Sequence, residues 1–216
     1  MRLLVARHGA TAHNENGRIT GQTDAPLSAL GQRQAEALGE RLAGARFDAI
    51  VSSDLARAME TAEAVARRMG LPVMIDPDLR EIAMGAWEGR VFAELLRDEP
   101  EMVRRVELDP LGAWGAPEGE TWARFSGRVH GALARWRDHV PAGKVLWVTH
   151  GGVVSVLLLR ALGLTFDRRR QFRRDNTSLF EFDYTPTAPI RVLRVNDTGH
   201  LERFASDAEG ERAQAL

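Results

Sequence analysis

Polar and ionisable residues that could act on a phosphate group lie at four predicted strand ends or strand-to-loop junctions. They are Arg7 and His8, Ser53 and Arg57, Glu81, and His150. In open α/β proteins the carboxyl ends of parallel strands meet at one edge of the sheet, and ligands bind there. We therefore expect two arginines, two histidines and a carboxylate to come together in one site.

This combination of side chains suits chemistry on a phosphate ester. Arginine offers a planar, permanently charged fork to phosphate oxygens. An imidazole can attack phosphorus as a covalent nucleophile, and a carboxylic acid can protonate the departing oxygen. The triplet Arg7-His8-Gly9 is a weak signal by itself, because a long chain can contain it by chance. Its place at the end of the first strand gives it weight.

Strand and helix patterns alternate along the chain, which is typical of a layered α/β fold. The expected strands cover residues 3–6, 47–52, 72–75, 145–148, 178–182 and 190–195. The expected long helices cover residues 28–42, about 56–69, about 120–140 and 153–162, and two short helices are expected within 80–119. Ser28 is the expected N-cap of the first of these helices, and Gly70 is the expected stop of the second.

The size and composition predict one globular domain. A chain of 216 residues with 44% hydrophobic content can bury a single large core. We assign residues 1–205 to this domain and residues 206–216 to a polar C-terminal tail. The formal net charge of −1 gives no general reason to expect a nucleic-acid partner. The basic run Arg168–Arg170, with Arg173 and Arg174, fits a solvated face or an approach to an anionic substrate better.

Other features exclude several classes of protein. The chain has no cysteine, which excludes disulfides and a thiolate nucleophile. The N-terminus lacks the pattern of a signal peptide, and the apolar run Val153–Leu159 is far short of the ~20 residues of a membrane span. We expect a cytoplasmic protein with no membrane partner, and a homodimer is the default if it forms oligomers.

Six ordered segments extend the pattern over residues 2 to about 180. They are Arg7-His8-Gly9-x-Thr11-x-x-Asn14; Gly21-x-x-Asp24-x-Pro26-Leu27-Ser28-x-x-Gly31; Ser52-Ser53-x-Leu55-x-Arg57-Ala58-x-x-Thr61-Ala62; Leu79-Arg80-Glu81-x-x-x-Gly85-x-Trp87-Glu88-Gly89; Gly119-Glu120-Thr121; and Thr149-His150-Gly151-Gly152. In this order they resemble the histidine phosphatase superfamily, the phosphoglycerate mutase-like group, and most closely its broad-specificity phosphatase branch. The resemblance implies a three-layer α/β/α sandwich with a mostly parallel sheet and a small helical cap insertion at about 90–118.

The resemblance also implies a role for each site residue. His8 would form a phosphohistidine, and Arg7, Arg57 and His150 would complete the phosphate pocket. Glu81, rather than the neighbouring Glu88, would act as proton donor and then as base for water. Asn14, Gly21, Gln22 and Gly151 would bind the substrate. His8 must be neutral to attack, and we expect Arg7 to disfavour its imidazolium form.

This scheme requires no metal and no cofactor. The remaining histidines, at 13, 130, 139 and 200, show no ligand spacing such as His-Glu-x-x-His. The expected partner is therefore a small phosphate ester alone. Two departures from the family pattern, Ala10 after the triplet and Ala83 after Glu81, fall outside the five-residue core and bear on substrate preference.

Three functions remain open at this point. The main hypothesis is a phosphomonoesterase acting on small phosphorylated metabolites. The second is a 2,3-bisphosphoglycerate-dependent phosphoglycerate mutase, in which arginines from Arg97 to Arg105 or from Arg168 to Arg174 replace the usual lysines. The phosphatase is favoured because Lys144 is the only lysine and Tyr184 the only tyrosine. The third is a regulatory module that binds a phosphate ligand without turnover. The natural substrate is left open among sugar phosphates, phosphoglycerates, nucleotide-like phosphates and the nucleotide-loop phosphate of cobalamin synthesis.

Overall fold

The structure is a computed structural model that describes residues 1–109, 111–185 and 188–202. The end of the domain predicted at 205 and the tail predicted at 206–216 lie outside the described residues. The strands are β1 (Arg2–Arg7), β2 (Ala49–Ser52), β3 (Val73–Ile75), β4 (Lys144–Thr149), β5 (Leu179–Asp183) and β6 (Arg191–Asp197). The α-helices are α1 (Ala12–Glu15), α2 (Ala29–Leu42), α3 (Ala56–Met69), α4 (Phe92–Asp98), α5 (Pro100–Glu107), α6 (Trp122–His139) and α7 (Gly151–Leu162). Short 3-10 turns are η1 (Pro77–Leu79), η2 (Gly85–Trp87), η3 (Phe166–Gln171) and η4 (Gly199–Leu201).

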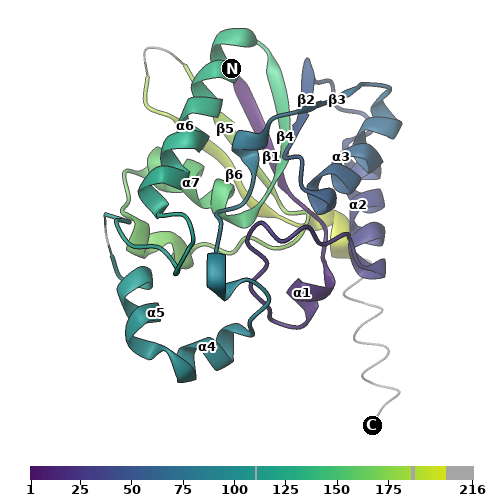
Figure 1. The fold of residues 1–216 in the computed structure, drawn as a ribbon. Coiled ribbons are helices and arrows are strands. Elements are labelled where there is room, and N and C mark those ends of the chain that lie inside the picture. The colour runs from purple at the N-terminus through teal and green to yellow at the C-terminus, as the bar shows by residue number, and fades with distance from the viewer. Residues whose placement is uncertain (110, 186–187, 203–216) are drawn as a thin grey trace.

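The six strands form one sheet in the order β3-β2-β4-β1-β5-β6. The first four strands in this order are parallel, β5 runs antiparallel to β1, and the edge strand β6 runs antiparallel to β5. The prediction of an α/β fold with a mostly parallel central sheet is therefore confirmed. Figure 1 shows α6 and α7 on one side of the sheet and α2 and α3 on the other.

Alternating strand residues bury the two faces of the sheet. Leu3 and Val5 of β1 pack with residues of α6 and α7, whereas Leu4 and Ala6 pack with α2 and α3. This is the consequence of a two-residue side-chain period in a strand that is covered on both sides. The three-layer arrangement follows from this burial. The helices cover the two faces of the sheet, and the carboxyl ends of β1, β2 and β4 are left free to form a site.

Local signals explain where the helices begin and end. Ser28 accepts a hydrogen bond from the Gly31 amide at the start of α2, and Gly70 ends α3 in the left-handed conformation. The last long helix was predicted to begin at residue 153, but α7 begins two residues earlier, at Gly151. His150 is its N-cap and its carbonyl accepts from the Val154 amide at 3.2 Å. The two glycines are therefore part of the first helical turn.

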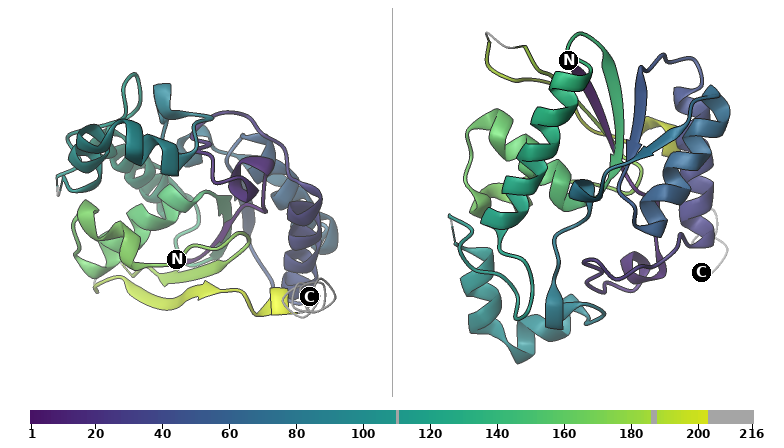
Figure 2. Two further views of the ribbon diagram at one scale, coloured as in Figure 1. Left: turned by 90° about the horizontal axis from the view of Figure 1, so that it is seen from below. Right: turned by 45° about the horizontal axis from the view of Figure 1, so that its top comes forward.

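The segment from α4 to α5 lies apart from the sheet. Trp87 and Leu95 are buried in a small separate cluster with Val103, Val106 and Ala116. In Figure 1 and in the right-hand view of Figure 2, these two helices lie at the end of the molecule toward which β1 and β4 run. They stand beside the carboxyl ends of the parallel strands, in the region for which a cap was predicted.

Candidate active site

The register of β1 against β4 brings the two predicted histidines together. Arg7 pairs with Thr149 in the parallel ladder, so the next residue of each strand, His8 and His150, stands at the same height above the sheet. Their ring centroids are 5.1 Å apart. Both side chains are buried, with exposed fractions of 3% and 0%. Both rings are therefore shielded from solvent.

The partners of His8 define its tautomer. Nδ1 lies 2.7 Å from the carbonyl oxygen of Gly9, and since a carbonyl only accepts, Nδ1 carries the proton. Nε2 then holds the lone pair, and it accepts a hydrogen bond from Nε of Arg57 at 3.3 Å. Burial, followed by the charges of Arg7 and Arg57, lowers the pKa of His8 well below 6.5. The expectation that Arg7 disfavours the imidazolium agrees with this direction, but burial is the larger cause.

Ser53 sets His150 in the same tautomer as His8. The Ser53 hydroxyl accepts from the Leu55 amide at 3.3 Å and lies 2.9 Å from Nε2 of His150. If the hydroxyl donates to Nε2, the ring proton is on Nδ1. This Nδ1 is buried and has no hydrogen-bond partner among the described residues. Burial, then the charges of Arg57, His8 and Arg7, lowers the pKa of His150 well below 6.5.

The two predicted arginines are held by main-chain carbonyls. Arg57 is fully buried and donates to the carbonyls of Gly21 at 2.7 Å and Thr23 at 2.9 Å. Arg7 donates through Nη1 to the carbonyl of Arg174, while its buried Nε has no partner within the part of the chain that the structure describes. Burial lowers the pKa of Arg7 to about 10, so it is still a cation at neutral pH.

Glu81 is held at the entrance to α7. Its carboxylate accepts from the Ile82 amide at 2.9 Å and from the Gly152 amide at 3.0 Å. A Cβ added to Gly152 would stand 2.0 Å from Oε1 of Glu81, so this approach requires a residue without a side chain. The structure therefore brings Glu81 into the same site as Arg7 and His8.

Glu88, the competing carboxylate, is fully engaged elsewhere. It accepts from the amides of Gln22 and Met84, each at 2.9 Å, and from the Thr23 hydroxyl at 2.7 Å. Burial acts to raise the pKa of Glu88, but these hydrogen bonds outweigh it and lower the pKa below its usual value. Glu88 thus shapes the loop around Gly21 instead of facing the cavity.

The predicted substrate-binding residues divide into two groups. Asn14, Gly21 and Gly151 line the cavity. Gln22 instead donates its side-chain amide to the Glu81 carbonyl at 3.0 Å, so it supports the loop that carries Glu81. The side chain of Asn14 accepts from Asn176 at 3.3 Å, and Asn176 also donates to the His8 carbonyl at 3.0 Å. The hydrogen bond from Asn176, which lies just before β5, fixes the main chain at His8.

Sequence reasoning missed Arg128 on α6. Its guanidinium donates to the carbonyls of Asp78, Arg80 and Glu81, each at 2.8 Å, and pairs with both oxygens of Glu120 at 2.9 Å. One side chain therefore fixes three carbonyls of the loop that presents Glu81. The sequence gave little indication of this role: Arg128 is an arginine between the apolar positions Phe125 and Val129 of a predicted amphipathic helix.

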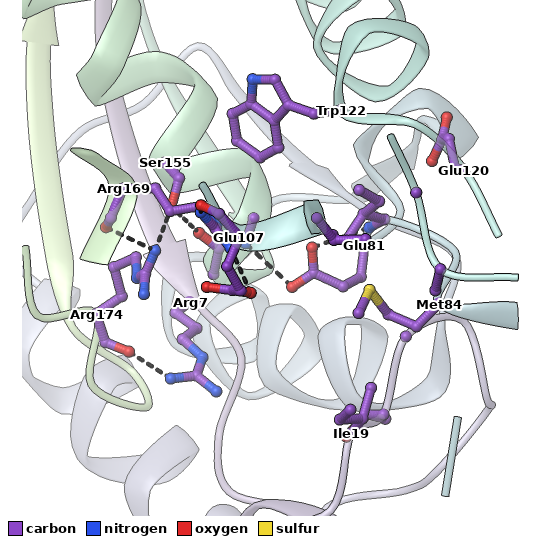
Figure 3. Close-up of a pocket in the computed structure, with 18 of the residues that line it drawn as sticks. Arg7, Ile19, Glu81, Met84, Glu107, Glu120, Trp122, Ser155, Arg169 and Arg174 are labelled. Carbon is purple, nitrogen blue, oxygen red and sulfur yellow. Dashed lines mark hydrogen bonds and ion pairs between the residues drawn. The ribbon is translucent and has the colours of Figure 1, made fainter. Parts of the chain in front are cut away.

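Arg7, His8, Arg57 and Glu81 line a cavity of about 370 Å³. His8, Arg57 and Glu81 lie at its inner end, and the exposed residues Arg18, Trp114 and Arg173 lie among its outer walls. Figure 3 shows Arg7, Glu81 and Glu107 pointing into this space from different elements. Among the described residues there is no group of three histidine, cysteine or acidic side chains placed to hold a metal ion. Nor does any described helix have the length and apolar character needed to cross a membrane.

Comparison with known proteins agrees with this fold and site. The family model of the histidine phosphatase superfamily (branch 1) matches residues 3–198. The chain is 36% identical over 212 residues to a protein of Yersinia enterocolitica named "Probable phosphoglycerate mutase GpmB", covering 96% of this chain and 98% of that one. The chain belongs to the histidine phosphatase superfamily and is an enzyme of this phosphatase and phosphoglycerate mutase family.

Two solved structures show how similar the folds are. A mycobacterial glucosyl-3-phosphoglycerate phosphatase in complex with VO3 has a TM-score of 0.83 and 30% identity, covering 91% of this chain and 99% of that chain. A phosphoserine phosphatase mutant from Entamoeba histolytica, in complex with phosphoserine, has a TM-score of 0.84 and 27% identity, covering 93% and 98%. The architecture is thus shared along nearly the whole length of each chain.

Proposed function

We propose that this enzyme hydrolyses small phosphomonoesters through a phosphohistidine on Nε2 of His8. The observation that carries the proposal is a pair of buried nitrogens, Nε of Arg7 and Nδ1 of His150, that have no partner in the described part of the chain and lie beside a neutral imidazole with its lone pair on Nε2. Buried polar groups without partners are costly. A phosphoryl group at this place would accept a hydrogen bond from both.

The first half of the reaction transfers the phosphoryl group to the protein. Nε2 of His8 forms a bond to phosphorus while the bond from phosphorus to the ester oxygen breaks, and Glu81 in its acid form gives its proton to that oxygen. Arg57 donates to Nε2 at 3.3 Å, a long contact for a hydrogen bond. A phosphoryl oxygen would draw this donor away from Nε2, because charge-assisted hydrogen bonds to an oxyanion are stronger.

The second half returns the phosphoryl group to water. The Glu81 carboxylate takes a proton from a water molecule as the water oxygen bonds to phosphorus and the phosphorus–Nε2 bond breaks. Inorganic phosphate leaves, and His8 is neutral again. The guanidiniums of Arg7 and Arg57 and the Nδ1 proton of His150 hold the charge on the equatorial oxygens, which is the main requirement in phosphoryl transfer.

The names of the relatives support a phosphatase and leave a mutase as the second candidate. Two similar solved structures are named as phosphatases, and the relative from Yersinia enterocolitica is named a probable mutase. A mutase needs a clamp for the second anionic group of its substrate. The only lysine, Lys144, begins β4 and stacks on Phe47, roughly 17 Å along the strand from the end that bears Thr149. Any such clamp must therefore be made of arginines.

A product analysis separates these candidates. Phosphate release is measured from a panel of phosphomonoesters without added metal, including 3-phosphoglycerate with and without 2,3-bisphosphoglycerate, with His8→Ala as the control. We expect release that depends on His8 and exceeds isomerisation of phosphoglycerate. Isomerisation well above release would establish the mutase. Binding of phosphate with no turnover would leave the regulatory module.

A further inference from the structure

The outer part of the cavity contains a cluster of arginines that face one glutamate. Arg169 and Arg170 of η3 form ion pairs with different carboxylate oxygens of Glu107, the last residue of α5. Arg169 also donates to the main-chain carbonyl of Glu107 at 3.0 Å. The side chains of Arg169 and Glu107 are only 11% and 18% exposed. Arg169 is therefore part of a partly buried ion pair, rather than of the solvated face considered for this basic run.

The other arginines of the cluster also have protein partners. Arg174 donates to the Ser155 hydroxyl and, at 3.2 Å, to the Arg169 carbonyl. Arg173 pairs with Asp175 at 2.9 Å. In Figure 3, Glu107 lies between Arg174 and Glu81 in the same cavity. The four arginines from 169 to 174 are thus already engaged by the protein, and Glu107 adds a negative charge among them.

Four aromatic side chains form another part of the cavity wall. Trp114, Trp122, Phe166 and Phe172 line it, and the rings of Trp122 and Phe166 lie 4.4 Å apart. Such a surface gains from contact with an uncharged group that has an apolar face. The rings themselves carry no positive charge to pair with a second carboxylate or phosphate.

We propose that Glu107 determines the substrate class by excluding phosphate esters that carry a second anionic group. The enzyme then prefers phosphomonoesters of uncharged alcohols. A substrate anion would have to displace Glu107 from Arg169 and Arg170, but Glu107 is part of the same chain and competes at a high effective concentration. Its charge also repels the incoming anion, so selectivity comes from a repulsive element as well as from the aromatic wall. This inference rests on the proposed function, of which it specifies the substrate.

The test compares two esters that differ only in charge. Glycerol 3-phosphate and 3-phosphoglycerate have the same carbon chain, with a hydroxymethyl group in the first where the second has a carboxylate. Binding of both is measured by calorimetry in the His8→Ala background, so that turnover does not interfere. The variants are Glu107→Gln, which keeps the shape and removes the charge, and Glu101→Gln, the same change at an exposed site on the same helix.

We expect His8→Ala to bind glycerol 3-phosphate more tightly than 3-phosphoglycerate. Adding Glu107→Gln should tighten 3-phosphoglycerate about tenfold, equivalent to about 1.4 kcal/mol, and change glycerol 3-phosphate less than about twofold. Glu101→Gln should change neither. An unchanged ratio of the two dissociation constants, or weaker binding of 3-phosphoglycerate to Glu107→Gln, would mean that Glu107 does not exclude a second anionic group.

The failure of the proposed function would look different. The same ratio is measured as kcat/KM for phosphate release by the enzyme with His8 intact. If the charge-dependent binding ratio is found but no phosphate is released, the role of Glu107 is supported and the proposed hydrolytic function is wrong. If neither ester binds to any variant, both proposals are wrong.

Discussion

The hydroxyl of Ser53 lies 2.9 Å from Nε2 of His150, although 97 residues separate them in the chain. This contact leaves the other ring nitrogen of His150 free to donate to a phosphate oxygen. We expect Ser53→Ala to weaken inhibition by inorganic phosphate or vanadate about tenfold and to lower the free energy of unfolding by about 1 kcal/mol. Nitrogen NMR of the His150 ring reports the tautomer directly. Loss of affinity with an unchanged tautomer would contradict this explanation.

Arg128 positions Glu81 without lining the cavity, so its removal should affect chemistry more than binding. For Arg128→Gln we expect kcat to fall about 10- to 100-fold, because the loop carrying Glu81 loses three main-chain anchors. Inhibition by inorganic phosphate should change less than about threefold. The free energy of unfolding should fall by about 2 kcal/mol as Glu120 loses its partner.

Arg124→Gln, at an exposed position of the same helix, is the matched control for Arg128 and should be neutral. If Arg128→Gln loses phosphate affinity as strongly as it loses kcat, Arg128 acts on the phosphate pocket as a whole rather than on Glu81.

Gly152 permits the approach of Glu81 to the start of α7. In Gly152→Ala the new methyl group would overlap Oε1 of Glu81 and force the carboxylate to move. We expect kcat to fall about 100-fold, since a shift of about 1 Å is enough for such a loss. Gly127→Ala, where a Cβ meets open space within α6, should instead stabilise the protein by about 0.5–1 kcal/mol. Equal activity of the two variants would contradict the placement of Glu81.

The two buried histidines make stability depend on pH. The pKa values of His8 and His150 in the folded protein are well below 6.5, mainly because of burial. Below pH 6.5 the unfolded chain therefore binds more protons than the folded one, and stability falls as the pH falls. The slope should approach about 2.7 kcal/mol per pH unit for the two groups together.

Thermal unfolding between pH 5 and 7.5 measures this pH dependence. The double variant His8→Gln/His150→Gln should lose most of the decline, although His130, whose pKa is also lowered by partial burial, keeps a share. An equally steep decline in the double variant would show that other groups cause it.

The sequence predicted the parts of this site that depend on strand ends. Arg7, His8 and His150 follow apolar strands, and a parallel register places such residues together whatever the details of packing. Glu81, in the loop after β3, was expected at the same edge, but its choice over Glu88 as the proton donor came from the resemblance. The structure then shows what holds it there: amides of Ile82 and Gly152, and the main-chain contacts of Arg128.

Contacts that span long distances in the sequence were not predictable from it. The ion pairs of Glu107 with Arg169 and Arg170 join residues more than 60 positions apart, and no periodicity of either segment indicates the other. The pairing of Ser53 with His150 is of the same kind, although both residues were named individually. Local patterns specify elements and their ends, whereas the partners of side chains between loops depend on the packed fold.

In the proposed mechanism the phosphoryl group passes through Nε2 of His8. The most direct measurement is to mix enzyme with a phosphomonoester, quench in alkali within the first turnover and map the phosphorylated residue by mass spectrometry. We predict a phosphohistidine at His8 that accumulates in Glu81→Gln and is absent in His8→Ala. Phosphate release by the wild-type enzyme with no phosphoenzyme, or with the label on another residue, would contradict the account.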